Sequence, residues 1–186
     1  KLLAIAKLSN GRVEVRVHPT MIPKDDILAK VNGVFNAIGV IGESVGETLF
    51  YGRGAGSMPT GSAVVSDLVD IARNIICSAD GTKKRVRVPP LAYLPAGRVC
   101  LPIKQMAEIE SRYYLRFMVE DRPGVLSKMS GVLGKNRISI ASVIQEGRGN
   151  EKGGVSLVMM THQALERDIQ AALLKIDQNG FITEPT

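Results

Sequence analysis

The chain has 186 residues, 45% of them hydrophobic, and a formal net charge of +6 at pH 7. This length is enough for one large or two small domains, each with its own hydrophobic core. No apolar run approaches the roughly 18 residues that a membrane-spanning helix needs, so we expect no membrane partner.

Residues 2–18 predict a β-hairpin. The segments LLAIAKL and VEVRVHP flank Asn10-Gly11, and Asn-Gly is the strongest short turn signal for a hairpin. In the second segment valines alternate with polar residues, which puts Val13, Val15 and Val17 on one face and Glu14, Arg16 and His18 on the other. Because the chain opens on Lys1 inside the first predicted strand, without an initiator Met, we expect it to be the C-terminal portion of a longer protein.

A second strand pair and a long helix complete the first half. A short helix is predicted over residues 25–31, and the segments VFNAIGVIG and VGETLFYG form a strand pair across Glu43-Ser44. From residue 62 to residue 79, apolar residues recur at helical spacing with polar residues on the other side. This half is therefore α+β, a mostly antiparallel sheet with a long helix.

A glycine-rich loop, FYGRGAGSMPTG, precedes this helix, and in it Gly52, Gly54 and Gly56 alternate. Glycines allow positive φ and a close approach of the backbone to another surface. Thr60 is predicted to cap the helix and Pro59 to stiffen the turn before it. A helix N-terminus after such a loop suits a phosphate or a carboxylate. The spacing is not Gly-x-Gly-x-x-Gly, however, so a tight connection that packs the helix on the sheet explains the loop at least as well.

Residues 81–111 are predicted to form a basic, proline-rich linker. Six cations and no acid lie between residues 81 and 104, and they account for the whole net charge: Lys83, Lys84, Arg85, Arg87, Arg98 and Lys104. A basic cluster can mark a nucleic-acid surface. Here the cations lie among prolines with Tyr93 as the only aromatic residue, so solvated linker charge is the favoured interpretation. Nucleic-acid binding through residues 83–87 is the alternative, and we expect no nucleic-acid partner.

The second half, residues 112–186, predicts the order β-α-β-β-α-β. YYLRFMV alternates as a strand, and the turn DRPG leads into an amphipathic helix that ends near Lys135. RISIASVIQEG is a strand whose alternation slips at Ala141-Ser142, as a bulge would make it do. The strand GGVSLVMMTH, a helix over residues 164–178 and a short strand FIT follow. This order is the ferredoxin-like plait.

The cysteines and histidines do not suggest a metal site. Cys77 and Cys100 have no His or Cys near either of them in the sequence, so we expect two free thiols of a cytoplasmic protein. His18 and His162 also stand alone, and lone histidines are more often structural than metal ligands.

Several linked motifs resemble one protein family. KLLAIAK, VEVRVHPTMIP, VNGVFNAI and YGRGAGSMPTGSAVVSDLVDIAR are similar to the C-terminal part of the catalytic domain of homoserine dehydrogenases. YYLRFMVEDRPGVLSKMSGVLGKNRISIASVIQ resembles the start of an ACT domain, a small regulatory module that binds amino acids. IKQMAEIESRYYLRFMVEDRPGVL resembles the junction between the two. The resemblance implies a catalytic and dimerisation portion at residues 1–80, the linker at 81–111 and an ACT domain at 112–186.

The resemblance implies an oxidoreductase. Homoserine dehydrogenases use NAD(P) to interconvert aspartate 4-semialdehyde and L-homoserine in threonine, methionine and isoleucine biosynthesis. In the family, a Rossmann domain binds most of the cofactor, and a catalytic Asp and Lys lie upstream of the segment that matches KLLAIAK. This chain contains neither, so we expect no catalytic residue in it and no activity of the chain alone. Exposed sheet edges in both halves lead us to expect a homodimer or homotetramer.

The resemblance also implies two sets of binding residues. The glycine-rich loop is expected to lie near the nicotinamide end of the cofactor, through Gly54, Ala55, Gly56 and Thr60. The ACT effector loop corresponds to Asp121, Gly124, Val125 and Leu126, with Asn136 and Ile138 near the next strand.

The expected effector is an amino acid, with threonine favoured. Asp121 can accept hydrogen bonds from its ammonium group, and the helix start after Pro123 can donate to its carboxylate. Two alternatives stay open. The segment 121–124 is simply a turn and helix start, or the chain is a stand-alone amino-acid sensor without a catalytic role.

Overall fold

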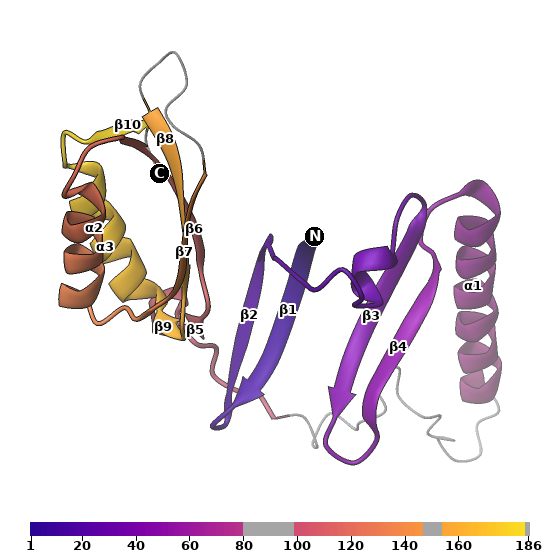
Figure 1. Cartoon of the computed structure of the whole chain (residues 1–186). Coiled ribbons are helices and arrows are strands. Elements are labelled where there is room, and N and C mark those ends of the chain that lie inside the picture. Colours follow the sequence, from indigo (N-terminus) through magenta and orange to yellow (C-terminus); the bar gives the residue numbers. More distant parts are fainter. Residues whose placement is uncertain (80–98, 147–153, 185–186) are drawn as a thin grey trace. The chain divides into compact units, whose positions relative to one another are not determined.

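The computed structural model describes residues 1–79, 99–146 and 154–184 (Figure 1). The chain forms two compact units, one made of Lys1 and Ile22–Cys100 and the other of Leu2–Met21 and Leu101–Thr186. The basic residues 83–87 and the rest of the predicted linker up to residue 98 lie outside the described ranges. Within those ranges no helix combines the length and the apolar character needed to cross a bilayer.

The first unit contains the predicted strand pair and the long helix. Its elements are η1 (Leu28–Lys30), β3 (Phe35–Gly42), β4 (Gly46–Arg53) and α1 (Ser57–Ala79). β3 and β4 pair antiparallel, and the rings of Phe35 and Tyr51 stack with their centroids 5.0 Å apart. Such an aromatic contact between neighbouring strands stabilises the pair beyond the area it buries. The short helix predicted over residues 25–31 is reduced to the 3₁₀ turn η1.

α1 begins at Ser57 rather than at residue 62, so Thr60 is not the N-cap that the sequence predicted. The Thr60 N–H instead donates to the Gly56 carbonyl oxygen at 3.1 Å, a bond of the helical type. Gly56 has a φ of 129°, which favours glycine, and turns the chain into the helix. Pro59 therefore falls in the first turn, where a missing N–H removes no intrahelical bond.

The second unit holds a hairpin, a short connecting segment and a larger α+β fold. Its elements are β1 (Leu2–Ser9), β2 (Arg12–Pro19), η3 (Met106–Glu108), β5 (Glu110–Ser111), β6 (Tyr114–Glu120), α2 (Val125–Lys135), β7 (Ile140–Glu146), β8 (Gly154–Thr161), β9 (Ala164–Leu165), α3 (Glu166–Asp177) and β10 (Ile182–Glu184). β1 and β2 form the predicted hairpin. Asn10 and Gly11 have φ values of 53° and 70°, the two left-handed positions that a type I′ turn requires.

The polar face of β2 is the covered one. Glu14 is 5% exposed, whereas Val15 and Val17 on the opposite face are 49% and 68% exposed. The alternation predicted from the sequence is present, but in this chain it buries charged side chains and leaves the valines open. An open apolar strand face of this kind is a surface that another protein segment can cover.

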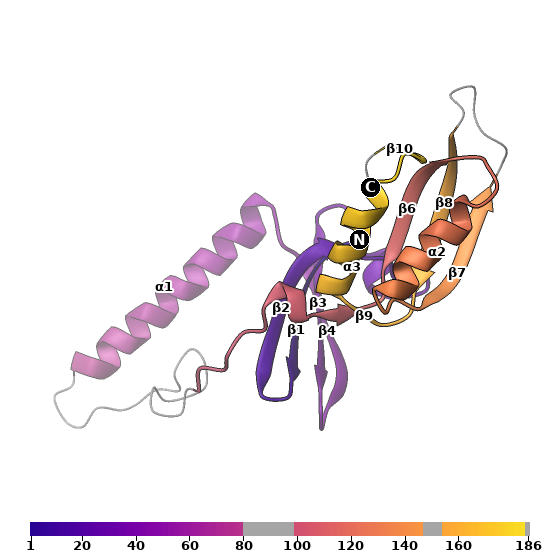
Figure 2. The ribbon, with the colours of Figure 1, turned by 90° about the vertical axis from the view of Figure 1, so that its left-hand side faces the viewer.

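The larger fold is ferredoxin-like. Its four-stranded sheet has the order β10-β6-β8-β7, in which all neighbours are antiparallel. α2 and α3 lie together on one face of this sheet (Figures 1 and 2). The register of β7 slips between Ile140 and Ser142, which confirms the predicted bulge. The observed order β6-α2-β7-β8-α3-β10 confirms the predicted βαββαβ arrangement and the α+β class.

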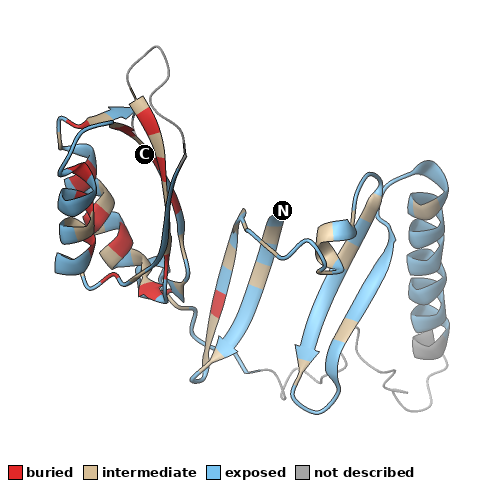
Figure 3. Cartoon of the chain, in the orientation of Figure 1, coloured by how far each residue is buried: buried red, intermediate tan, exposed pale blue. Residues whose placement is uncertain are grey.

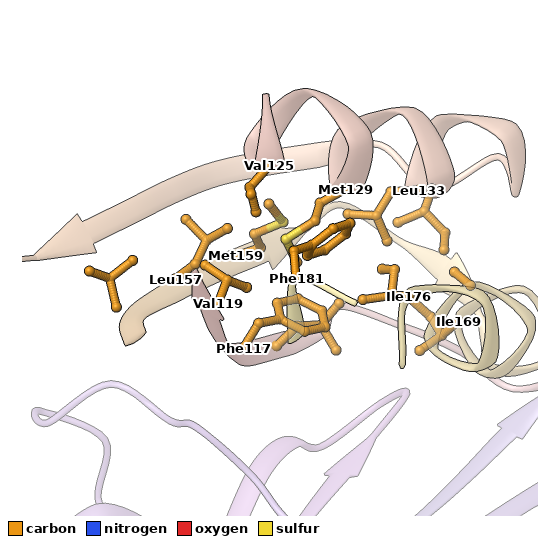
Figure 4. Close-up of a cluster of buried hydrophobic side chains, with 14 of the residues drawn as sticks. Phe117, Val119, Val125, Met129, Leu133, Leu157, Met159, Ile169, Ile176 and Phe181 are labelled. Atoms are coloured by element: carbon orange, nitrogen blue, oxygen red, sulfur yellow. The ribbon is translucent and has the colours of Figure 1, made fainter. Parts of the chain in front are cut away.

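The buried side chains concentrate between this sheet and its two helices (Figure 3). Along β8 every second residue from Val155 to Thr161 is buried, as expected for a strand with one covered face. The helices contribute residues at helical spacing: Val125, Met129, Leu133, Ile169, Ala172 and Ile176. Phe117 and Phe181 lie among these side chains (Figure 4). The core thus holds β6 and α2 in place, and the candidate site lies where these two elements meet.

Candidate functional site

An open cavity of about 330 Å³ lies where β6 ends and α2 begins. Residues 119–126 form most of its wall, and Gln145 of β7 and Leu157 of β8 complete it. The wall therefore combines charged groups of the turn with apolar groups of the core. A small polar molecule with one apolar part fits such a lining.

The start of α2 supplies hydrogen-bond donors to this cavity. Gly124, the N-cap residue, has a φ of 90°, and no side chain caps the helix. The first backbone N–H groups of a helix have no intrahelical acceptor, and the helix dipole adds partial positive charge there. Together these features favour a carboxylate at the mouth of α2.

Acceptors lie on the other side of the same turn. The Gln145 Nε2 donates to Asp121 Oδ1 at 3.5 Å, and the Arg122 Nε lies 2.7 Å from Glu120 Oε2. Arg122 thereby offsets the charge of Glu120, while the Asp121 carboxylate contacts only the neutral amide among these neighbours. Asp121 is thus the acidic group of this turn best placed to accept hydrogen bonds from an ammonium group.

The structure brings together four of the six predicted effector residues. Asp121, Gly124, Val125 and Leu126 line the same cavity. Our sequence analysis did not identify Gln145, although a signal for it exists. The bulge shifts the alternation of β7 so that Gln145 pairs with Leu157, and both then contribute to the cavity.

The other two predicted effector residues have structural contacts in this chain. Asn136 is the C-cap residue of α2, where its Nδ2 donates to the Val132 carbonyl oxygen at 2.7 Å. Its Oδ1 accepts a hydrogen bond from Lys175 Nζ of α3 at 2.8 Å. Ile138 is 4% exposed and belongs to the hydrophobic core. Neither residue lines the cavity, because both lie beyond the opposite end of α2.

The predicted cofactor loop is exposed in this chain. Ala55, Gly56 and Thr60 are all exposed, so their surfaces are open to another molecule. Gly54 is exposed as well, and it also has contacts inside the β3–β4 hairpin. A Cβ at residue 54 would lie 1.9 Å from the Nδ2 of Asn36, and the Gly54 N–H donates to the Val34 carbonyl oxygen at 3.3 Å. A side chain at residue 54 would therefore have to displace the amide of Asn36, which is exposed and can rotate away.

We expect Gly54→Ala to loosen the β3–β4 hairpin by at most about 1 kcal/mol, because the new methyl group overlaps the Asn36 amide, which is exposed and can move aside. In an Asn36→Ala background the same change should be neutral or slightly stabilising, since Gly54 does not need a positive φ. Hydrogen exchange of the β3 and β4 amides measures both effects. An equal loss of protection in the two backgrounds would contradict the packing explanation.

Metal-binding groups are not clustered in the described ranges, where no set of three or more His, Cys, Asp or Glu side chains could hold an ion. Cys100 is an exposed free thiol, and the side chain of Cys77 lies outside the described residues. His18 contacts its neighbours Pro19 and Thr20.

Comparisons with known proteins match both halves of the chain. Residues 1–69 match the homoserine dehydrogenase family and residues 113–181 match the ACT domain. The chain is 41% identical over 185 residues to a homoserine dehydrogenase of Neisseria gonorrhoeae and 40% identical to that of Pseudomonas aeruginosa. Both alignments cover 100% of this chain, but 41% and 42% of the respective relative. The crystal structure of a homoserine dehydrogenase from Thiobacillus denitrificans superposes on all of the chain, with a TM-score of 0.83 and 41% identity, over 40% of its own length.

These matches place a homoserine dehydrogenase family portion, residues 1–69, before an ACT domain, residues 113–181. The chain belongs to the homoserine dehydrogenase family, which confirms the resemblance seen in its motifs. It spans about 40% of the length of the curated relatives that it matches.

Proposed function

We propose that this chain is the C-terminal part of a homoserine dehydrogenase, which interconverts aspartate 4-semialdehyde and L-homoserine with NAD(P). The pathway is that of threonine, methionine and isoleucine, in the cytoplasm. The observation that carries the proposal is the succession of two family matches, residues 1–69 and 113–181, in one chain with 41% identity to a single relative over its whole length. A stand-alone sensor, our alternative, would not need the first of these two portions.

The residues of the glycine-rich loop fit a cofactor only in part. The Gly54 N–H donates to the Val34 carbonyl oxygen at 3.3 Å and the Thr60 N–H to the Gly56 carbonyl oxygen at 3.1 Å, so both donors already have acceptors within the chain. The exposed backbone of Ala55 and Gly56 and the Thr60 hydroxyl remain. We propose that these three groups border the nicotinamide cofactor, which supplies the hydride transfer when bound. Residues outside this chain would hold most of it.

The test of the enzyme assignment uses the protein with its upstream residues restored. We expect homoserine oxidation, followed at the nicotinamide absorbance, in the longer protein and no turnover by residues 1–186 alone. The second expectation follows from the family resemblance, which implies that the catalytic Asp and Lys lie upstream of the segment KLLAIAK. A longer protein that is folded but oxidises homoserine with neither NAD⁺ nor NADP⁺ would overturn the assignment.

We further propose that the cavity at the start of α2 binds an amino acid, with threonine the first to test. The helix start would receive the carboxylate and Asp121 the ammonium group, while Val125 and Leu126 would contact the side chain. The helix start and Asp121 both line this cavity, which supports this orientation because the ligand carries a carboxylate and an ammonium group on one carbon. Asn136 and Ile138 stay outside the proposed site of one chain.

Asp121→Ala is expected to weaken threonine binding about tenfold or more, because one charge-assisted hydrogen bond is worth roughly 1.5–3 kcal/mol. Turnover of the longer enzyme without threonine should stay near normal. Calorimetry and a threonine titration of homoserine oxidation measure the two effects. Asp168→Ala, which removes an acid of α3 that pairs with Arg167, is the matched control. Identical curves for wild type and Asp121→Ala would exclude Asp121 from the site.

We also propose that the longer protein is a homodimer or homotetramer. The exposed valines of β2 and the exposed apolar side chains of α1, such as Met58 at 80% and Ile76 at 70%, support this proposal. Surfaces of this kind commonly mark protein–protein contacts. Light scattering of the longer protein tests it.

A further inference from the structure

Residues 101–111 join the hairpin β1–β2 to the ferredoxin-like fold. At their start they run alongside β2, where the Val13 N–H donates to the Pro102 carbonyl oxygen at 2.9 Å. The Lys104 N–H returns a bond to the Val13 carbonyl oxygen at 2.8 Å. These two bonds extend the hairpin sheet by one short parallel bridge, so the segment is fixed to β2 by its backbone.

The other end of the same segment is fixed to the ferredoxin-like fold. Ile109 is 2% exposed, and its carbonyl oxygen accepts a hydrogen bond from the Glu166 N–H at 2.9 Å. Glu110 and Ser111 then pair with β9 as strand β5, immediately before α3. The segment is therefore held at both ends, and we name residues 101–111 the strap.

A bidentate ion pair between Arg12 of β2 and Glu108 joins the middle of the strap to the hairpin. The Arg12 Nη1 lies 3.1 Å from Glu108 Oε1, and its Nη2 lies 2.6 Å from Glu108 Oε2. The Gln105 N–H also donates to Glu108 Oε2 at 3.1 Å, in a capping box at η3. The hydrogen bonds from Arg12 and from the Gln105 backbone lower the pKa of Glu108 from 4.5 to about 2. The pair thus favours the folded chain at neutral pH, and this contribution is lost as the pH falls from about 4.5 toward 2.

A buried polar cluster adjoins the strap. Glu14 and Arg16 of β2 form an ion pair of 2.5 Å, with side chains 7% and 6% exposed. On the other side, the Tyr113 hydroxyl donates to Glu166 Oε2 at 2.6 Å. Burial raises the pKa of Tyr113, as do the hydrogen bond and charge of Glu166, and the charges of Arg16 and Glu14 also act on it. The charges of Glu14 and Arg16 in the hairpin are therefore close enough to act on Tyr113, the residue before β6.

β6 connects this contact to the candidate amino-acid site. The strand runs from Tyr114 to Glu120, and Asp121 follows directly at the cavity. The Tyr113 N–H is fixed by Thr161 Oγ1 at 3.0 Å, and the inward face of β6 is packed in the core. Close-packed interiors have low compressibility and transmit strain. A shift of β6 at Glu120, the end next to the cavity, would thus displace Tyr113 at its other end and the strap beside it.

We propose that the strap, closed by Arg12 and Glu108, transmits amino-acid binding at the start of α2 to the β1–β2 hairpin of the dehydrogenase portion. The inference rests on the proposed function, in which an amino acid binds there and changes turnover. Such a transmission needs an element with two arrangements, and we assign that role to the strap. In one, Glu108 is bound to Arg12 and the strap lies along β2, and in the other both contacts are open.

The experiment uses the longer enzyme and reverses first the charge of Glu108 and then the charges of both Glu108 and Arg12. Glu108→Arg places two cations together and opens the pair, while the double variant Arg12→Glu/Glu108→Arg restores opposite charges. L-Threonine affinity is measured by calorimetry, and its half-inhibitory concentration is measured in homoserine oxidation. Arg167→Gln, which removes an exposed ion pair within α3, is the control.

We expect Glu108→Arg to raise the half-inhibitory concentration about tenfold, within the usual range of coupling between sites, while the binding constant changes less than about threefold. The double variant should return to within about threefold of wild type. Hydrogen exchange should show faster exchange at Val13 and Lys104 in Glu108→Arg, with unchanged protection in β6. If β6 loses protection, the milder Glu108→Gln is judged by the same criteria.

If Glu108→Arg is folded, still binds threonine and is inhibited as wild type is, the proposal that the strap transmits binding is wrong. The proposed function would then remain intact. Failure of the double variant to recover would also overturn it, since the effect would not then belong to this ion pair. A wild-type enzyme that neither binds nor responds to threonine, isoleucine, methionine, lysine or serine would overturn both proposals.

Discussion

Phe117→Ala is expected to destabilise the ferredoxin-like fold by about 3–5 kcal/mol, a large part of the 5–15 kcal/mol that holds a typical domain together. Phe117 is 0% exposed, and its ring lies in the cluster formed by the sheet and both helices (Figure 4). Truncation removes its buried apolar surface and leaves a cavity that the packed neighbours cannot fill. Urea unfolding of this chain, followed by circular dichroism, measures the loss.

The matched control lies on the same strand. Tyr114 is 46% exposed on the opposite face of β6, so Tyr114→Ala should cost far less than Phe117→Ala. Because β6 leads directly to Asp121, we also expect Phe117→Ala to weaken threonine binding, and Tyr114→Ala to leave it unchanged. Equal losses of stability in the two variants would contradict the packing described here.

Glu14→Ala is expected to destabilise the chain by about 3–5 kcal/mol, although it changes only one residue of a two-stranded hairpin. The guanidinium of Arg16 is buried, its Nη1 lies 2.5 Å from Glu14 Oε1, and its Nε has no hydrogen-bond partner among the described residues. Without Glu14 the positive charge would remain desolvated and lose its counter-charge. Desolvation of an unpaired charge is the costly part of such a variant.

A double variant separates the charge from the packing. Glu14→Leu/Arg16→Met fills the same space with apolar groups, so it should be close to wild type in stability, or above it. Unfolding of the wild type, of each single variant and of the double variant forms a complete cycle. If the two single losses simply add in the double variant, the pair is not the buried unit that the distances indicate.

Several features of this fold could be predicted from the sequence because they depend on the chemistry of neighbouring residues. Asn10-Gly11 predicted a hairpin because both residues tolerate the left-handed φ values that a type I′ turn needs, and the structure has those values. The slip in alternation at Ala141-Ser142 predicted the bulge of β7 for an equally local reason. The resemblance to ACT domains implied Asp121, Gly124, Val125 and Leu126 as a group, and they line one cavity because they are near one another in the chain, around one helix start.

Sequence reasoning was less successful where a residue has more than one possible partner. Thr60 has the chemistry of an N-cap, but the helix already starts at Ser57, after the turn at Gly56. Asn136 has the chemistry of a ligand-binding amide, but its two ends bond to Val132 and Lys175. Lys175 lies on another helix, so this competition could not be seen in the local sequence.

The sequence by itself determined the order of elements, the turn types and the apolar periodicity, because these depend on residues within a few positions of one another. Only the tertiary structure decided which face of β2 is covered and that the described residues 101–111 form a strap. Glu14 is buried beside Arg16, which pairs with its carboxylate, and Glu108 pairs with Arg12 from far along the chain. The cost of burying a charge depends on the partners that tertiary contacts supply, and local periodicity carries no information about those partners.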